Sequence, residues 1–242
     1  MKFVLLLLIA VSVVHADTNF LLGVNSAGKL TNGTRNNFAM EGDAISCCAH
    51  WFTSFTNYAG VPAVTGVSSN AAASGDFTTN FANTYTAEIY PIRRGGGTNA
   101  YLFEQGGAND IGTGGSPIYP ADVIFKAKTS YWAQARADGF KICAITVTPR
   151  TGWAGNPDMH GAQTNLNAQI VAASNLWDYC YRADLMFPDS SDTTYYTDGT
   201  HPTQARDDLQ GLMIATNLLP VFQTTISGPV QFSGAFPAGA IQ

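Results

Sequence analysis

Charged residues are scarce in this chain, at 12% of its 242 residues or about half of the share usual in globular proteins. The net charge is −5 and no run of lysine and arginine is present, so nucleic acid and anionic membrane surfaces are not expected partners. Beyond the N-terminus, no segment is apolar for long enough to predict a membrane span. The polar surface therefore has to come from uncharged side chains, a composition that suits export and contact with carbohydrate.

Cysteines are also few, and only Cys47, Cys48, Cys143 and Cys180 are present. They form no CxxC pair and do not combine with histidines at the intervals of zinc sites, so we expect no metal. In an exported protein four cysteines permit two disulfides, and the sequence does not choose among the three possible pairings. Cys143 lies in an apolar strand pattern and is alternatively a buried small hydrophobic residue.

The N-terminus has the pattern of a secretory signal peptide. Lys2 precedes a short apolar run over residues 4–14, and Ala16 precedes a polar segment. The run is too short for a membrane anchor. We therefore predict a signal peptide over residues 1–16 and a secreted protein, extracellular or periplasmic. An N-terminal extension (17–36), one globular domain (37–222) and a Gly- and Pro-rich tail (223–242) follow.

Short apolar strands alternate with helices along the domain. Strand patterns cover 37–41, 61–67, 101–105 and 141–148, and helix patterns cover 76–89, 121–137, 164–181 and 203–219. The helix at 121–137 has Pro120 before its start and Gly139 just beyond its end. This alternation predicts a single three-layer α/β domain with a parallel sheet, whose site lies at the carboxyl ends of the strands.

Asp198 and His201 are separated by a tight Gly-Thr turn. A histidine acts as a general base when one ring nitrogen is held by a partner, and a carboxylate three residues earlier can reach that nitrogen. The alternative is a helix-capping aspartate beside an incidental histidine.

Two further segments offer hydrogen-bond donors for an oxyanion. Asn109, in Gly107-Ala108-Asn109-Asp110, follows an apolar strand and carries a side-chain amide, although Asn-Asp turns are common at strand ends. Gly75 closes a loop of small residues and offers a backbone N–H that no side chain shields. Gly66 is a rival for the second role.

The segment Gly42-Asp43-Ala44-Ile45-Ser46 has the pattern of a nucleophile turn without its nucleophile. Together with the Gly75, Asn109 and Asp198–His201 segments, in this order and spacing, it resembles the SGNH (GDSL) hydrolase family. The resemblance implies a flavodoxin-like parallel sheet of about five strands. It also implies a nucleophilic serine at position 44, His201 as base and Asp198 as its orienting acid. The oxyanion hole would be formed by the N–H groups at 44 and Gly75 and by the Asn109 amide, and no cofactor would be needed.

Position 44 departs from that pattern, because a methyl group cannot attack a carbonyl. One explanation is a Ser→Ala change in an active enzyme, which the retained base, acid and oxyanion amide favour. The other is a natural pseudoenzyme. Ser46 is better interpreted as a helix-start residue than as a substitute nucleophile.

The expected activity is that of a secreted ester hydrolase acting on a short acyl ester, such as an acetyl group on a polysaccharide. Trp51 and Trp153 are candidate substrate contacts, with core packing as the alternative. Lipase or thioesterase activity, ester or carbohydrate binding by an inactive scaffold, and a structural or adhesive role remain as alternatives. The sequence does not indicate an oligomeric state.

Overall fold

The computed structural model describes residues 36–47, 50–58, 60–61, 65–93, 99–112 and 115–222. It also describes the antiparallel pair β1 (Gly23–Val24) and β2 (Leu30–Thr31). The predicted signal peptide, the rest of the N-terminal extension and the C-terminal tail lie outside the described residues. Within these residues no helix combines the length and the apolar character needed to span a bilayer.

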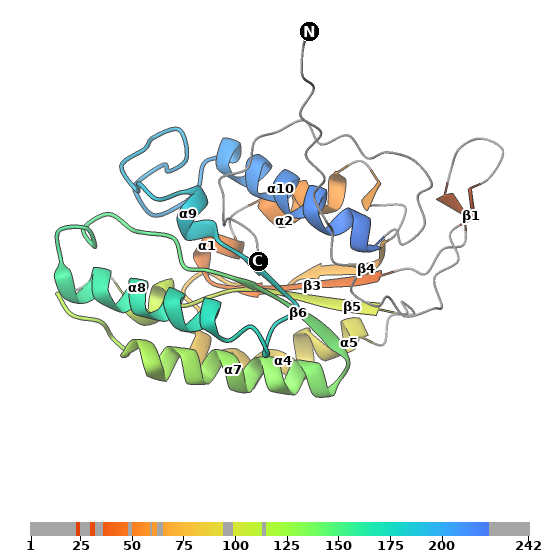
Figure 1. The fold of residues 1–242 in the computed structure, drawn as a ribbon, viewed down its shortest axis with the longest axis horizontal. Coiled ribbons are helices and arrows are strands. Elements are labelled where there is room, and N and C mark those ends of the chain that lie inside the picture. The colour runs from red at the N-terminus through yellow and green to blue at the C-terminus, as the bar shows by residue number, and fades with distance from the viewer. Residues whose placement is uncertain are drawn as a thin grey trace, which may run out of the picture.

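A five-stranded parallel sheet forms the centre of the domain (Figure 1). Its strands are β3 (Asn36–Gly42), β4 (Thr65–Asn70), β5 (Asn99–Gln105), β6 (Phe140–Ile145) and β7 (Tyr179–Tyr181). Their order across the sheet is β4-β3-β5-β6-β7, and every pair is parallel. This confirms the predicted flavodoxin-like sheet. Gly42 pairs with Gln105, so the loops after β3 and β5 begin side by side.

Helices cover both faces of the sheet (Figure 1). On one face lie α4 (Phe81–Glu88), α5 (Tyr90–Arg93), α7 (Ala121–Ala137) and α8 (Pro157–Ala172), and on the other lie α2 (Trp51–Asn57) and α10 (Gln204–Phe222). Short elements stand at the strand ends: α1 (Ala44–Cys47), η1 (Thr78–Asn80), α6 (Ala108–Ile111) and α9 (Ala183–Met186).

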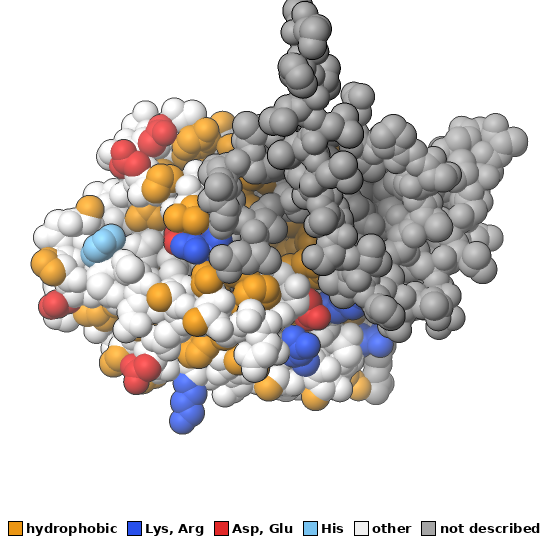
Figure 2. Space-filling view, in the orientation of Figure 1, with side chains coloured by type: hydrophobic (Ala, Val, Ile, Leu, Met, Phe, Trp, Pro, Cys, Tyr) orange, Lys and Arg blue, Asp and Glu red, His pale blue; other side chains and the backbone are white. Residues whose placement is uncertain are grey.

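Successive side chains of β3 enter different cores, because neighbouring residues of a strand point to opposite faces. Phe38 and Met40 pack under α2 and α10, whereas Ala39 packs against the α4, α7 and α8 side. Every residue of β3 is buried. On the outer surface, Figure 2 shows few charged side chains among many uncharged ones on the face in view, as the composition requires.

The structure corrects the expected bounds of one helix and one strand. The helix expected at 164–181 is α8, which begins at Pro157 and ends at Ala172. The Asn156 side chain accepts the N–H groups of Asp158 and Met159 and so caps the helix about two turns earlier than expected. The chain then forms β7, a strand of three residues that its pairing with β6 stabilises. Similarly, the strand expected at 61–67 begins at Thr65.

Cys143 and Cys180 are both buried and both free. They lie on neighbouring strands but face opposite cores, so they do not pair with each other. The interpretation of Cys143 as a buried hydrophobic residue is confirmed. The Cys47 side chain and Cys48 lie outside the described residues.

Candidate active site

The turn after β3 is built around the carboxylate of Asp43. Its Oδ1 accepts the Ile45 N–H at 3.0 Å, and its Oδ2 accepts the Ala108 N–H at 3.1 Å. The side chain is buried, and this burial raises the pKa of Asp43 to about 6. Asp43 thus fixes the start of α1 to the loop after β5 and places Ala44, which is half-buried, as the first residue of α1.

Ser46 holds the same turn from the other side. Its hydroxyl donates to the Gln105 carbonyl at 3.0 Å, and its side chain is fully buried. A Cβ on Gly42 would collide with the Ser46 hydroxyl and lie 2.5 Å from the Gln105 carbonyl oxygen, so position 42 requires glycine. Ser46 is therefore a structural part of the turn, which agrees with its interpretation as a helix-start residue.

The loop after β4 brings Gly75 to this edge of the sheet. The Ala73 N–H donates to the Gly42 carbonyl at 3.1 Å, which ties the loop to the turn that holds Ala44. Gly75 has φ of +86°, and a Cβ there would meet no atom within 4 Å. The rival Gly66 lies inside β4, away from its carboxyl end. The structure therefore favours Gly75 as the loop glycine.

Asn109 lies in α6 and is tied to the Gly75 loop. Its Nδ2 donates to the Asp76 carbonyl at 2.9 Å, and because an amide nitrogen carries two hydrogens, one more remains for a ligand. The neighbouring Asp110 is buried and accepts the N–H groups of Thr78 and Thr79, at 2.8 and 3.3 Å. It therefore braces the segment that follows Gly75.

Asp198 and His201 form the contact that their spacing predicts. Asp198 Oδ2 and His201 Nδ1 lie 2.7 Å apart, and Asp198 Oδ1 accepts the N–H groups of Thr200 and His201. These backbone bonds, the His201 N–H first, lower the pKa of Asp198 to about 2. The imidazole is 45% exposed, so a substrate in solution can approach it. An aspartate held on Nδ1 directs Nε2 away from itself, as a general base requires.

The loop after β6 supports this turn. The Thr151 N–H donates to the Gly199 carbonyl at 2.7 Å, and Gly199 has φ of +74°. A Cβ on Gly199 would collide with the Thr151 hydroxyl. A chain of hydrogen bonds therefore joins the Ala44 turn, the Gly75 loop and Asn109. A further hydrogen bond fixes the Asp198–His201 turn to the loop after β6.

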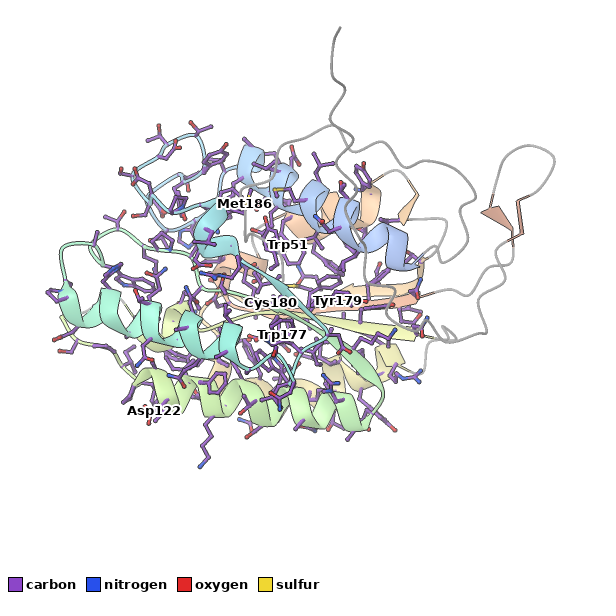
Figure 3. All side chains as sticks on the ribbon, viewed as in Figure 1. Trp51, Asp122, Trp177, Tyr179, Cys180 and Met186 are labelled. Atoms are coloured by element: carbon purple, nitrogen blue, oxygen red, sulfur yellow. The ribbon has the colours of Figure 1, made fainter. Side chains whose placement is uncertain are left out.

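The two tryptophans proposed as substrate contacts are core residues. Trp51 is 1% exposed, lies between α10 and the sheet (Figure 3), and packs edge-on against Phe52 and Phe103. Trp153 is 2% exposed, and its indole N–H donates to the Gly112 carbonyl at 3.0 Å. Neither indole ring has a face exposed to a sugar. The expected role of Trp51 and Trp153 as substrate contacts is therefore corrected: both pack in the core.

A buried acidic pair beneath the site was not anticipated. Glu41 and Glu104 are neighbours across β3 and β5, and both are fully buried. Glu41 accepts the Gly42 N–H at 3.1 Å, and burial raises the pKa of Glu41 to about 8. Glu104 accepts the Gly106 N–H at 2.8 Å and binds Lys128, also fully buried, through both oxygens at 2.7 and 2.8 Å. A carboxylate at the end of each apolar strand was the sequence signal for this pair.

The hollow at these strand ends is small. The residues that line it lie at the end of β5 and in the segments that follow β3, β5 and β6: Asp43, Ile45, Gln105, Gly106, Ala108, Val147 and Thr148. A larger apolar cavity of about 310 Å³ lies between β6, β7 and α10, and none of the predicted site residues lines it. Among the described residues no group of three or more His, Cys, Asp or Glu side chains is arranged to hold a metal.

No family model and no curated protein matches the sequence. Solved structures do match the fold. A GDSL-like lipase from Bacteroides thetaiotaomicron has a TM-score of 0.57 at 19% identity, over 81% of this chain and 91% of that one. A lipase/acylhydrolase from Enterococcus faecalis has a TM-score of 0.56 at 17% identity, over 77% and 96%. An acetylxylan esterase from Geobacillus stearothermophilus has a TM-score of 0.55 at 14% identity, over 78% and 94%. The chain therefore has the fold of GDSL-like lipases and esterases.

Proposed function

We propose that this chain is a carboxylic-ester hydrolase of the SGNH (GDSL) type in which alanine occupies the nucleophile position. The observation that carries the proposal is the 2.7 Å contact between Asp198 Oδ2 and His201 Nδ1, on a fold that GDSL-like lipases and esterases share. The loop contacts that join Ala44, Gly75 and Asn109 support it, because acyl transfer needs oxyanion donors beside the nucleophile.

With a hydroxyl at position 44, the reaction is a double displacement. The hydroxyl oxygen attacks the ester carbonyl, and His201 Nε2 accepts its proton while Asp198 holds the ring. The N–H groups at 44 and Gly75 and the Asn109 amide donate to the oxyanion. His201 then protonates the leaving alcohol. In the second half, water attacks the acyl-enzyme with His201 again as base, and the acid is released.

With Ala44 the first attack has no nucleophile, so only a residual rate from binding and the oxyanion donors is expected. The retained acid–base pair and amide favour a Ser→Ala change in an otherwise competent enzyme. The competing proposal, a natural pseudoenzyme that binds esters or carbohydrates, rests on Ala44 itself.

We propose a short acyl ester as the substrate, such as an acetyl group on a polysaccharide. The small hollow lined by Asp43, Ala108 and Thr148 supports a short acyl group, and the acetylxylan esterase among the similar folds supports an acetyl ester. A lipase or thioesterase of the same chemistry is the alternative for longer chains. The predicted signal peptide over residues 1–16 supports secretion.

The test is the substitution Ala44→Ser, assayed on p-nitrophenyl acetate, butyrate and decanoate. Ala133→Ser, at an exposed position of α7, is the matched control because it makes the same chemical change away from the site. We expect Ala44→Ser to gain at least 10³-fold in rate, since this is the usual scale of losing the nucleophile, and to prefer acetate. A preference for decanoate would indicate a lipase. Absence of turnover on all three esters would reject the hydrolase.

A further inference from the structure

Arg150 reaches from the loop after β6 to the loop that carries Asn109. Its Nη1 donates to the Ala108 carbonyl at 3.2 Å, and its guanidinium lies 5.8 Å from the centre of the Trp153 ring. The Ala108 N–H is bound by Asp43 Oδ2 at 3.1 Å. Ala108 is therefore held on both sides: Asp43 of the Ala44 turn accepts its N–H, and Arg150 donates to its carbonyl. The next residue along the chain is Asn109.

The backbone beside Arg150 holds the base turn. Thr151 donates its N–H to the Gly199 carbonyl at 2.7 Å, between Asp198 and His201. The adjacent residues 150 and 151 thus contact the two segments that the proposed reaction has to align, the Asn109 segment and the Asp198–His201 turn.

The positive charge of Arg150 lies near two carboxylates of the candidate site, those of Asp43 and Asp198. The side chain is half-buried, and burial lowers the pKa of Arg150, while the carboxylates of Asp43 and Asp198 act in the opposite direction. These two acids stand beside Ala44 and His201 respectively. Arg150 Nε is buried and has no hydrogen-bond partner, so the guanidinium is held by Ala108, by Trp153 and by its charge rather than by a dedicated ion pair.

We propose that Arg150 is a positioning residue for the reaction proposed above: its guanidinium fixes the Asn109 segment relative to the Asp198–His201 turn. The proposal rests on the proposed function. Because a displacement of about 1 Å between reacting groups can cost 10²-fold in rate, loss of one such contact changes turnover more than binding.

The test uses the Ala44→Ser background and compares Arg150→Met and Arg150→Lys with Arg136→Met. Methionine preserves most of the apolar stem that packs on Trp153, and lysine keeps the charge without the planar fork. Arg136 is an exposed arginine of α7, paired with Asp178, and serves as the matched control. We expect Arg150→Met to lower kcat about 10- to 100-fold with KM within about threefold. The kcat of Arg150→Lys should lie between that of Arg150→Met and that of the Ala44→Ser background. The kcat of Arg136→Met should equal that of the background.

Added guanidinium, at concentrations that leave the thermal unfolding midpoint unchanged, should restore part of the kcat of Arg150→Met and leave Arg136→Met unaffected. If Arg150→Met does not fold, Arg150→Lys decides, and a kcat within twofold of the background overturns the proposal. A loss in Arg150→Met that neither lysine nor guanidinium relieves also overturns it, because that loss would be one of packing. If Ala44→Ser is itself inactive, the proposed function fails and this role falls with it. If Ala44→Ser is active but Arg150→Met matches it, only the role of Arg150 fails.

Discussion

Glu41 makes the stability of this protein depend on pH in a direction opposite to that of most surface carboxylates. The side chain is fully buried beside Gly42, and burial raises the pKa of Glu41 from 4.5 to about 8. Between these two values the folded protein holds a proton that the unfolded chain releases. The free energy of unfolding therefore falls as pH rises through this window, by about 1.4 kcal/mol per pH unit.

The substitution Glu41→Gln removes this titration and keeps an acceptor oxygen for the Gly42 N–H. Asp43 and Asp207, whose pKa values burial raises to about 6, titrate in both proteins, so the difference between the proteins isolates Glu41. From pH 5 to pH 8 the free energy of unfolding of Glu41→Gln should rise relative to the unsubstituted chain by at most about 4 kcal/mol, from three units of that slope.

Urea unfolding followed by tryptophan fluorescence at pH 5, 6, 7 and 8 measures this difference. Trp51, Trp132 and Trp153 are nearly fully buried and report the loss of both cores. Two stability curves that run parallel across the four pH values would refute the reasoning, because Glu41 would then be titrating alike in the folded and unfolded chains.

Three further outcomes follow from single contacts. Lys128→Met should lower the free energy of unfolding in urea by about 3–5 kcal/mol because it removes the ion-pair partner of the fully buried Glu104 carboxylate, and adding Glu104→Gln should recover part of that loss; equal stability of the single and double variants would contradict this. In the Ala44→Ser background, Asp198→Asn should lower kcat by about 10²–10⁴-fold on p-nitrophenyl acetate, since His201 Nδ1 loses its carboxylate; unchanged turnover would show that another group orients the base. Gly199→Ala should lower the free energy of unfolding by about 1–3 kcal/mol because of its positive φ and the collision with Thr151, and an unaltered unfolding midpoint would argue against that strain.

The sequence predicts the central part of this fold because its signals there are local. The helix α7 has Pro120 before it and Gly139, with φ of +88°, just beyond it, and β6 is a continuous apolar run. The strand β7 could not be predicted in the same way, because the three residues Tyr179–Tyr181 owe their extended form to pairing with β6. The predicted end of α8 at residue 181 is wrong for the same reason, because the chain beyond Ala172 leads into β7.

In the site, too, contacts between residues close in sequence can be predicted, whereas contacts between distant residues cannot. Asp198 and His201 are three residues apart, so their contact can be predicted from one turn. The contact of Arg150 with Ala108 spans 42 residues, and the pairing of Lys128 with Glu104 depends on where α7 packs on the sheet. Burial of Trp51 and Trp153 is likewise a property of the packed layers, which an amphipathic side chain does not reveal by itself.

The proposed function requires that position 44 is the nucleophile position and that the Asp198–His201 pair can still activate a serine there. Labelling with a fluorophosphonate tests it without any assumption about the substrate, because an activated serine hydroxyl displaces fluoride and forms a covalent bond to phosphorus. Intact-mass and peptide analysis should find one adduct, on the peptide that holds position 44, in Ala44→Ser. It should find none in the unsubstituted chain and little in Ala44→Ser with His201→Ala. An adduct on another residue, or no adduct in Ala44→Ser, would contradict the claim.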